Sequence, residues 1–491
     1  MVSGTQWPGG DPFLQRQNEP SMAVSSRNPM HVVAGDNDYR TVDLPFVPGA
    51  EETGDAWLGF FTSYDGGQTW TSTLVPGYPQ DTSSQGTSSP LHGRAAGADP
   101  VVRPGTNGMF YYSGLAFNRD KSGSSIFVAR YVDDNNLEGG SSIRYIDTHL
   151  VARGSSSENP NASIFLDKPT IAVDVPRAGS PTCTIPGGAN APQQTISAGF
   201  MYVAYTEFTG PESQANAQIK LSVSSDCGVT WSFPINLSGD QGALTNQGAQ
   251  IAIDPNNGKV YVFWRVFANS ETEDQNAITG VSLTAGIPGD SSIDFVNEIQ
   301  INPFDQGTSD TSFRTNAYPA IAIDNHSNLY VAWSQRGLAP NGDARISVYS
   351  RPLSCGECGY QTTVDPYNGP GHQIMPALAF SSGKLTVAWY DFRDDDQSFI
   401  YTPTANPGQY LLTLQPDGSL VFGFQVADPP STYAGNLRHT VDVRAAQGTQ
   451  GDSLIFQPSV LVSQYAYGSP TPATSTSPIE QLEFNAPNLP L

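Results

Sequence analysis

The sequence has few charged residues, and positive charge is especially scarce. Its 491 residues contain 23 Lys and Arg against 46 Asp and Glu, so charged residues make up 14% of the chain and the formal net charge is -23. A protein with this charge repels polyanions, and no run of Lys or Arg offsets that repulsion locally. The composition therefore excludes a nucleic-acid-binding protein.

Several sequence features of common protein classes are also missing. No run of about 18 apolar residues is present, which excludes a membrane-spanning helix. A glycine-rich phosphate loop, HExxH and GxSxG are absent, so NTP hydrolysis, zinc proteolysis and α/β-hydrolase chemistry have no support. The first ten residues lack the basic and then apolar pattern of a signal peptide. The protein is therefore either cytoplasmic or a secreted or cell-surface protein whose leader has been replaced by Met1. Low Lys content, abundant small polar residues and strong acidity favour the second alternative.

Cysteine is rare, with only Cys183, Cys227, Cys355 and Cys358 in the chain. The CxxC spacing of the last two fits half of a zinc site, a redox pair or a disulfide that closes a short loop. A zinc site needs a second compact ligand pair, and a thioredoxin-like site needs a βαβ context, and neither is present. We therefore predict two structural disulfides, with the Cys355–Cys358 pairing the better supported.

The chain is rich in turn-forming and aromatic residues, and it repeats itself. It has 48 Gly and 39 Pro, with 10% aromatic residues, which is typical of many short strands and turns. Six copies of one pattern follow each other: a short apolar strand that often begins at Pro, a turn, and a second apolar strand that ends in an aromatic and polar cluster. The copies begin at Pro20, Pro100, Pro169, Ala249, Pro319 and Pro376.

Each copy has room for two further strands, which can be identified, for example, at 57–64 and 69–75. Four-stranded units that cannot bury their faces alone are typical of radial stacking. We therefore predict an all-β protein, a six-bladed β-propeller of four-stranded antiparallel blades, over residues 18–467. A chain of separate β-sandwiches would need polar linkers and at least seven strands in each unit, which are absent. The remaining parts are an N-terminal segment (1–17), an extra hairpin insertion (about 397–433) and a flexible Pro/Ser/Thr-rich tail (468–491).

Two outer hairpins carry nearly the same turn, at 63–70 and 224–231, and both fit S-x-D-x-G-x-T-W. The Asp carboxylate can accept backbone N–H bonds across such a turn, Gly permits a positive φ, and Trp packs against the sheet. The pattern resembles the Asp-box, or BNR repeat, of sialidases and related propellers. In that family the box lies on the outer hairpin, away from the active site. The resemblance therefore implies structural roles for Ser63, Asp65, Gly67, Trp70, Ser224, Asp226, Gly228 and Trp231.

The same resemblance bears on activity. Sialidases hold the substrate carboxylate with an arginine triad and use a Tyr nucleophile activated by Glu, with an Asp as acid and base. Asn18 stands where their first arginine is expected. His372 and its neighbours occupy the place of the tyrosine, with Tyr367 only nearby. Ordinary sialidase activity is therefore not expected, and whether the chain is a glycoside hydrolase at all stays open.

A site is expected at one mouth of the ring, because the loops that enter the first strands and those that leave the second strands lie at the same end of each blade. The polar residues of the loops that enter the first strands are Asn18, Glu19, His92, Arg94, Asp99, Asp167, Lys168, Asn246, Gln247, Arg314, Asn316, Tyr318 and His372. Glu207 and Asp38 are the acid/base candidates. The substrate-binding candidates are Arg314, Arg265, Arg393, Arg94, Arg336, Tyr318 and Asp391. The competing interpretation is that Asp–Arg pairs such as Asp391 with Arg393 only brace neighbouring blades.

Three functions fit these observations. The first is a secreted sialidase-like propeller that binds and cleaves a glycan or polysaccharide at the mouth. The second is a non-catalytic propeller that binds a glycan or a protein there. The third is a structural or surface-assembly protein that self-associates through the insertion or the tail. No cofactor is expected. The acidic run at 394–396 is a candidate for structural calcium, but it lacks EF-hand spacing and fits a solvated acidic loop better.

Overall fold

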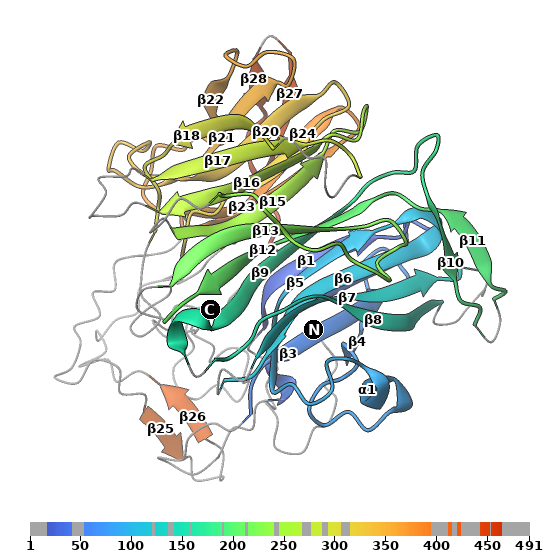
Figure 1. Cartoon of the computed structure of the whole chain (residues 1–491). Coiled ribbons are helices and arrows are strands. Elements are labelled where there is room, and N and C mark those ends of the chain that lie inside the picture. The colour runs from blue at the N-terminus through green and yellow to red at the C-terminus, as the bar shows by residue number, and fades with distance from the viewer. Residues whose placement is uncertain are drawn as a thin grey trace. The chain divides into compact units, whose positions relative to one another are not determined.

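The computed structural model describes residues 17–41, 54–119, 123–135, 142–157, 159–188, 191–211, 215–239, 245–267, 276–286, 293–305, 315–393, 411–414, 420–423, 442–451 and 453–463. The regular secondary structure of these residues is almost entirely β-strand (Figure 1). They fall into two compact units, which are described separately. Unit 1 comprises 1–44, 51–301 and 325–327, and unit 2 comprises 45–50, 302–324 and 328–491.

Unit 1 contains the strands of the first four sequence copies, here called repeats 1 to 4, each with four strands in antiparallel order. Repeat 1 is β1 (Gln17–Val24), β2 (Val32–Asp38), β3 (Trp57–Ser63) and β4 (Thr71–Leu74). Repeat 2 is β5 (Ala96–Pro104), β6 (Met109–Phe117), β7 (Ser124–Asp133) and β8 (Ile143–Arg153). Repeat 3 is β9 (Ile164–Val173), β12 (Met201–Thr209), β13 (Asn216–Ser224) and β14 (Ile235–Asn236). Repeat 4 is β15 (Thr245–Ile253), β16 (Val260–Phe267), β17 (Ala277–Leu283) and β18 (Asp294–Gln300), and a parallel bridge between Ala217 and Thr245 joins it to repeat 3.

Unit 2 contains repeats 5 and 6. Repeat 5 is β19 (Ala320–Ile323), β20 (Asn328–Gln335), β21 (Arg345–Pro352) and β22 (Tyr360–Thr363). Repeat 6 is β23 (Gln373–Ser381), β24 (Lys384–Asp391) and β27 (Asp442–Gln450), with β28 (Leu454–Phe456) and β29 (Val460–Leu461) both paired to β27.

The few remaining elements are short. The hairpin β10 (Thr182–Ile185) and β11 (Gln194–Ser197) is inserted in repeat 3. A helix, α1 (Ser84–Ser88), begins after the capping residue Ser83, and three 3-10 turns cover Tyr39–Thr41, Thr106–Gly108 and Pro160–Ala162. No helix among the described residues has the length and apolarity needed to cross a membrane.

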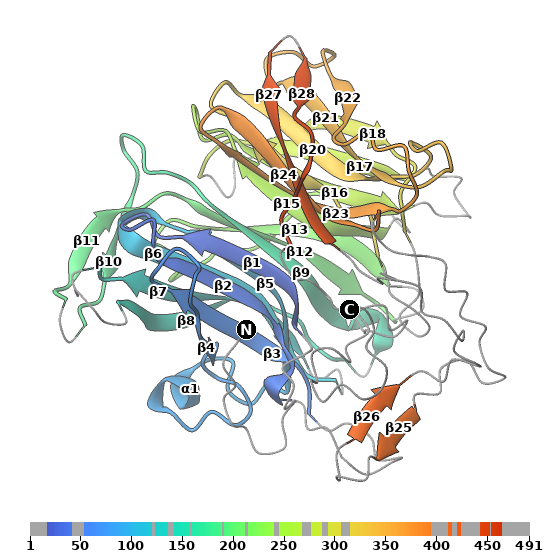
Figure 2. The same cartoon turned by 180° about the vertical axis from the view of Figure 1, so that it is seen from behind.

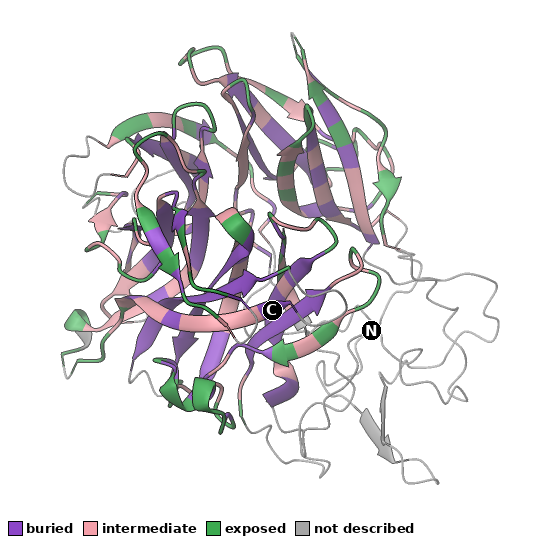
Figure 3. Cartoon of the chain, turned by 90° about the vertical axis from the view of Figure 1, so that its right-hand side faces the viewer, coloured by how far each residue is buried: buried purple, intermediate pink, exposed green. Residues whose placement is uncertain are grey.

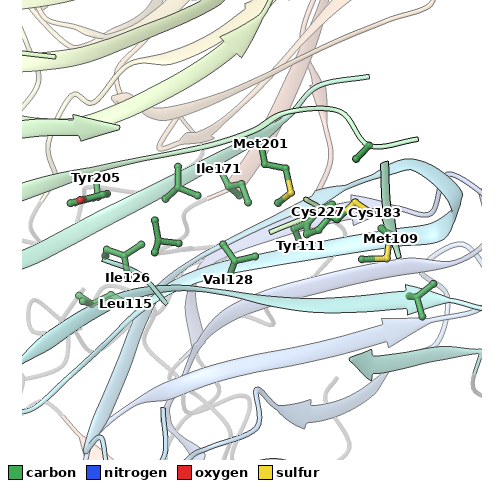
Figure 4. Close-up of a cluster of buried hydrophobic side chains, with 14 of the residues drawn as sticks. Met109, Tyr111, Leu115, Ile126, Val128, Ile171, Cys183, Met201, Tyr205 and Cys227 are labelled. Carbon is green, nitrogen blue, oxygen red and sulfur yellow. A yellow bond between two sulfur atoms is a disulfide. The ribbon is translucent and has the colours of Figure 1, made fainter. Parts of the chain in front are cut away.

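The core of unit 1 lies between neighbouring repeats. Every residue of β6 is buried, so this strand has no alternating pattern, as expected for a strand covered on both faces (Figure 3). One apolar cluster joins repeats 1 and 2, and another joins repeats 2 and 3. In the second cluster Tyr111, Val128 and Met201 point toward each other across the two sheets (Figure 4). Burial of these facing surfaces is what holds one repeat against the next.

The predicted fold class is confirmed for the all-β content and the four-stranded antiparallel sheets. The two predicted disulfides are also present, as Cys183–Cys227 and Cys355–Cys358. The first ties the β10–β11 hairpin to the turn that follows β13. Within the predicted insertion, β25 (Leu411–Leu414) pairs with β26 (Leu420–Gly423) as a hairpin. The rest of the insertion and the tail lie outside the described residues, while closure of a six-bladed ring and the domain boundaries stay predictions.

Candidate functional site

The first strand of each repeat in unit 1 is bent at the same place by a β-bulge. The register of each of these strands shifts near its start, and the residue at the shift has a positive φ. These residues are Glu19 in β1 (φ 54°), Asp99 in β5 (57°), Lys168 in β9 (45°) and Gly248 in β15 (68°). A bulge re-aims the side chain at its position and is frequent beside active sites.

The left-handed conformation is costly for three of these four residues. A residue with a Cβ atom loses about 1–2 kcal/mol in it, whereas glycine does not. Gly248 shows that the bulge itself accepts glycine. The backbone therefore does not require the charged residues of the first three repeats, and strain of this kind is typically retained for the side chain that it positions.

The three charged side chains meet at one place, although they come from three repeats. β1, β5 and β9 lie side by side in unit 1 (Figure 2). Lys168 Nζ lies 3.1 Å from Glu19 Oε1 and 3.7 Å from Asp99 Oδ1. The backbone N–H of Lys168 also donates to Asp99 Oδ2, at 3.0 Å. We call Glu19, Asp99 and Lys168 the bulge cluster.

Two asparagines support the cluster from repeat 1. Asn37, on β2, donates from Nδ2 to Asn18 Oδ1 at 2.7 Å and to Glu19 Oε2 at 3.3 Å. Its side-chain oxygen Oδ1 accepts from the backbone N–H of Asp99 at 2.9 Å. Asn37 thus fixes Glu19 and Asp99 relative to each other.

The protein around the cluster favours a protonated carboxyl group. Burial, then the charge of Asp99, raises the pKa of Glu19 to about 7, and the opposing effect of Lys168 is smaller. Burial also raises the pKa of Asp99, against the effect of Lys168. The side chains of Glu19 and Lys168 nevertheless keep 35% and 28% of their surface exposed, so solvent and ligands can reach them. A carboxyl group that titrates near neutral pH beside a carboxylate and an ammonium group is suited to general acid catalysis.

Three of the sequence candidates, Asp38, Asp391 and Arg393, are held in buried ion pairs. Asp38 is closed off from solvent and accepts from Arg40, whose Nη2 lies 2.6 Å from it and also donates to the carbonyl of Thr73. In unit 2, Arg393 Nη2 lies 2.7 Å from Asp391 and 2.6 Å from Asp365. The contact between Arg393 and Asp365 matches the bracing interpretation, because Asp365 follows the last strand of repeat 5 and Arg393 follows β24 of repeat 6. The pair of Asp38 and Arg40 stays within repeat 1.

Glu207 lies on the strand that pairs with β9, the strand that holds Lys168. It is on β12, directly opposite Leu166 of β9, while Thr206 is opposite Asp167. Its Oε1 lies 3.3 Å from Lys220 Nζ, and 19% of the side chain is exposed. Glu207 is therefore a reachable carboxylate one strand away from Lys168.

The other candidates each have protein partners of their own. In unit 1, Arg94 Nη2 donates to Ser125 Oγ at 3.1 Å, and Arg265 donates to the side-chain carbonyl of Asn276. In unit 2, Arg336 donates to backbone carbonyls and stacks on Phe304 at 4.4 Å. Tyr318 Oη accepts from Asn316 at 3.1 Å. Arg314 lies outside the described residues.

Sequence reasoning placed Glu19, Asp99 and Lys168 in the mouth loops but did not select them. A usable signal was present: a charged residue stands directly before Pro20, Pro100 and Pro169, at the same position of three successive copies. The residue before proline is normally restricted to extended conformations. Charge and a bulge at this position therefore indicate a specialised site.

The two S-x-D-x-G-x-T-W turns have the same hydrogen bonds. Asp65 Oδ1 accepts from Ser63 Oγ at 2.8 Å and from the backbone N–H of Thr69 at 2.9 Å, and Asp226 Oδ1 accepts from Ser224 and Thr230 at the same distances. Hydrogen bonds from Thr69 and Ser63 lower the pKa of Asp65 to about 2. Burial opposes ionisation of Asp226, but the bonds from Thr230 and Ser224 outweigh it and lower the pKa.

Every charged oxygen of these turns is used locally, which supports the structural role. The Asp226→Ala variant is expected to lose about 1–2 kcal/mol of stability, as when a helix loses its capping side chain. Because the pKa of Asp226 is lowered, this contribution is present above pH 4 and is lost as the pH falls below it. Urea unfolding measures it, with the exposed neighbour Ser225→Ala as control. Lost ligand binding with unchanged stability would contradict the structural role.

No group of three or more His, Cys, Asp and Glu side chains in the described part of the chain is arranged to hold a metal ion. The acidic run at 394–396 lies outside that part. The bulge cluster also contains a lysine ammonium within 3.7 Å of both carboxyl groups, which occupies the place that a cation would take.

Comparison with known proteins gives structural similarity only. Neither the known family models nor the curated proteins contain a match. An α-L-arabinofuranosidase of Fusarium graminearum, solved with arabinobiose, is 13% identical over 78% of this chain and 90% of its own, with a TM-score of 0.45. An α-L-arabinanase of Penicillium chrysogenum is 14% identical over 77% and 89%, with a TM-score of 0.43. A Trypanosoma rangeli sialidase is 12% identical over 77% of this chain and 53% of its own, with a TM-score of 0.40. Sialidases are thus among the solved structures similar to this chain, as the resemblance of the two turns predicts.

Proposed function

We propose that this protein binds a glycan at the bulge cluster and hydrolyses a glycosidic bond there. The observation that supports this most directly is the carboxyl group of Glu19, reachable from solvent and with a pKa of about 7. Glycoside hydrolases usually use two carboxyl groups, one as general acid and the other as base or nucleophile, and their surroundings set these roles.

In the proposed reaction, Glu19 donates its proton to the glycosidic oxygen while the bond from that oxygen to the anomeric carbon breaks. A water molecule adds to the anomeric carbon, and its proton passes to a carboxylate, for which we propose Glu207. Asp99 shares a hydrogen bond with Glu19 and raises its pKa, so it acts by keeping the proton on Glu19 until the substrate takes it. Asn37 and Lys168 hold both groups in place.

The cluster also supports a preference for the sugar bound there. It holds two carboxyl groups against one ammonium, and Asn18 stands where sialidases have an arginine. A sugar carboxylate would face net negative charge at this point once the cluster ionises. We therefore propose that the sugar in contact with Glu19 carries no carboxylate. Secretion or surface location remains part of the proposal, supported by the two disulfides.

A specific observation also favours non-catalytic glycan binding as a second candidate. Lys168 already contacts both carboxyl groups and partly neutralises them. A cluster satisfied in this way can bind sugar hydroxyls through Asn18, Asn37 and Glu19 without proton transfer.

A panel of aryl glycosides and neutral polysaccharides, measured for both binding and turnover by the wild-type protein, separates the two candidates. Turnover that falls as the pH rises through about 7 would support hydrolysis, since Glu19 must be protonated. Binding without turnover would support the second candidate. Neither binding nor turnover on the panel would contradict both.

A further inference from the structure

Two arginines of repeat 2 lie next to each other without an ion pair among the described residues. Arg94 precedes β5, and its Nη2 donates to Ser125 Oγ at 3.1 Å. Arg153 ends β8 and lies directly opposite Ser125 in the β7–β8 ladder. Directly opposed residues project from the same face of a sheet, with Cβ atoms about 4.5–5.5 Å apart. The side chain of Arg153 therefore starts on the face where Arg94 reaches Ser125.

The guanidinium group of Arg94 is held in position. A Cβ atom at Gly123 would lie 2.9 Å from Arg94 Nη1, so the backbone of this loop packs closely on the group. Asn118 fixes the loop from both sides, since its N–H donates to the carbonyl of Gly123 and its side chain accepts from the N–H of Ala95. Burial and the charge of Arg153 both lower the pKa of Arg94. The protein thus orients a cation beside a second cation.

Several other arginines of unit 1 are paired with carboxylates, although Arg27 and Arg103 donate to amide or backbone oxygens instead. Arg40 pairs with Asp38, Arg130 with Asp147, and Arg144 with Asp134. Arg119 pairs with Asp55. In a chain with twice as many acidic as basic residues, two adjacent arginines that have no ion pair with any carboxylate of the described residues are unexpected on charge alone. Like charges repel, and a bound anion is the simplest way to offset that repulsion.

We propose that Arg94 and Arg153, with Ser125, form a subsite for an oxyanion, and that the oxyanion is a sulfate or carboxylate substituent of the bound glycan. Guanidinium groups suit such oxyanions because two parallel N–H groups can donate to two oxygens. Arg94 is five residues before Asp99, which limits the distance between their Cα atoms to about 18 Å. A glycan can therefore place a neutral sugar at the bulge cluster and an acidic substituent at the arginines. The oxyanion subsite rests on the arginines alone, whereas its assignment to a glycan rests on the proposed function.

Inorganic sulfate is the first probe, because it tests the subsite without any glycan. Replacing chloride by sulfate at constant ionic strength is expected to raise the unfolding temperature of the wild-type protein along a saturating curve. The Arg94→Gln and Arg153→Gln variants should lose the saturating part, with at least a tenfold weaker apparent affinity. Sulfate also stabilises proteins by exclusion from their surface, but that effect does not saturate and is common to all variants.

Two controls separate this proposal from the preceding one. Arg119→Gln removes an arginine that is paired with Asp55 and 72% exposed, and should keep the sulfate response. Glu19→Gln should also keep it, even if glycan hydrolysis is lost. Because Arg153 is exposed, the Arg153→Gln variant should fold normally. Its circular dichroism spectrum checks this. A saturating response that is absent from the wild type, or unchanged in Arg153→Gln, would overturn the subsite.

A second set of ligands identifies the source of the oxyanion. Sulfated, carboxylated and neutral oligosaccharides of equal length are compared by calorimetry with wild type and Arg153→Gln. Tighter binding of one acidic series, reduced to the neutral level in Arg153→Gln, would assign the substituent. Equal binding of all three series by the wild type would refute the assignment of the oxyanion to a glycan. The sulfate response tests the subsite independently of this result.

Discussion

At pH 8, the Asp36→Asn variant is expected to unfold at a clearly higher urea concentration than the wild-type protein. Asp36 lies on β2 with 7% of its surface exposed, and its Oδ1 has no hydrogen-bond partner in the described part of the chain. Burial, then the charge of Asp38, raises its pKa from 3.8 to about 8, and Arg40 opposes this only in part. The folded protein therefore keeps a proton that the unfolded chain loses.

The sign of the pH dependence follows from these two values. Below pH 3.8 both states carry the proton, and Asp36 has no pH-dependent effect. Between pH 3.8 and 8 the free energy of unfolding falls with each pH unit, because Asp36 ionises in the unfolded chain but stays protonated in the folded protein. One unit corresponds to about 1.4 kcal/mol, so the loss reaches on the order of 5 kcal/mol at pH 8. Asparagine has nearly the same shape and cannot ionise, so the variant should avoid this loss.

The measurement is urea unfolding at pH 4, 6 and 8. The stability difference between variant and wild type should be small at pH 4 and grow steadily to pH 8. Asp294→Asn is a matched control, because Asp294 is 58% exposed and its contact with Lys259 at the surface contributes little. A difference that is the same at all three pH values would show that Asp36 does not carry the proton.

The second large effect is expected for Glu19→Gln, which should lower turnover of a hydrolysed glycan by about 10²- to 10⁴-fold. Glutamine keeps the shape and the contact with Asn37 but has no acidic proton to donate. A loss of this size is the usual contribution of a general acid. Because Glu19 has a pKa of about 7, wild-type turnover should fall above that pH, and the residual activity of the variant should lack this decline.

Two further variants make the result specific. Lys168→Met should move the decline to higher pH, because Lys168 lowers the pKa of Glu19 in the wild type. If Glu207 is the base proposed here, Glu207→Gln should reduce turnover without changing the pH at which turnover declines. Substrate binding by Glu19→Gln and its circular dichroism spectrum show that the variant is folded. Turnover within tenfold of wild type in Glu19→Gln would remove Glu19 from the mechanism.

Much of the fold could be predicted because its signals are local. The strands predicted at 319–324 and 329–333 are found as β19 and β20, since apolar runs on both sides of a short polar turn leave few alternatives. The hydrogen bonds of the turn around Asp65 join residues no more than four positions apart. The insertion after β24 was harder to interpret, because only the hairpin of β25 and β26 carries a periodic pattern.

The candidate site could be predicted less well. The sequence placed Asp38 and Arg393 at the same mouth as Glu19, and it gave no reason to prefer one over another. Asp38 proved to be turned toward Arg40, two residues away, while Glu19 is turned outward by the bulge in β1. Both residues are carboxylates at the predicted mouth, Glu19 where a first strand begins and Asp38 where a second strand ends, and only the contacts of the two side chains separate them.

The sequence by itself determined the repeated strands, the two matching turns and the disulfide between Cys355 and Cys358. These depend on residues close together in the chain. The tertiary structure decided which charges meet. Lys168 contacts Glu19 across 149 positions, and this happens only because three bulged strands lie side by side with matching register. Such contacts depend on how strands from different repeats align, and no local pattern in the sequence specifies that alignment.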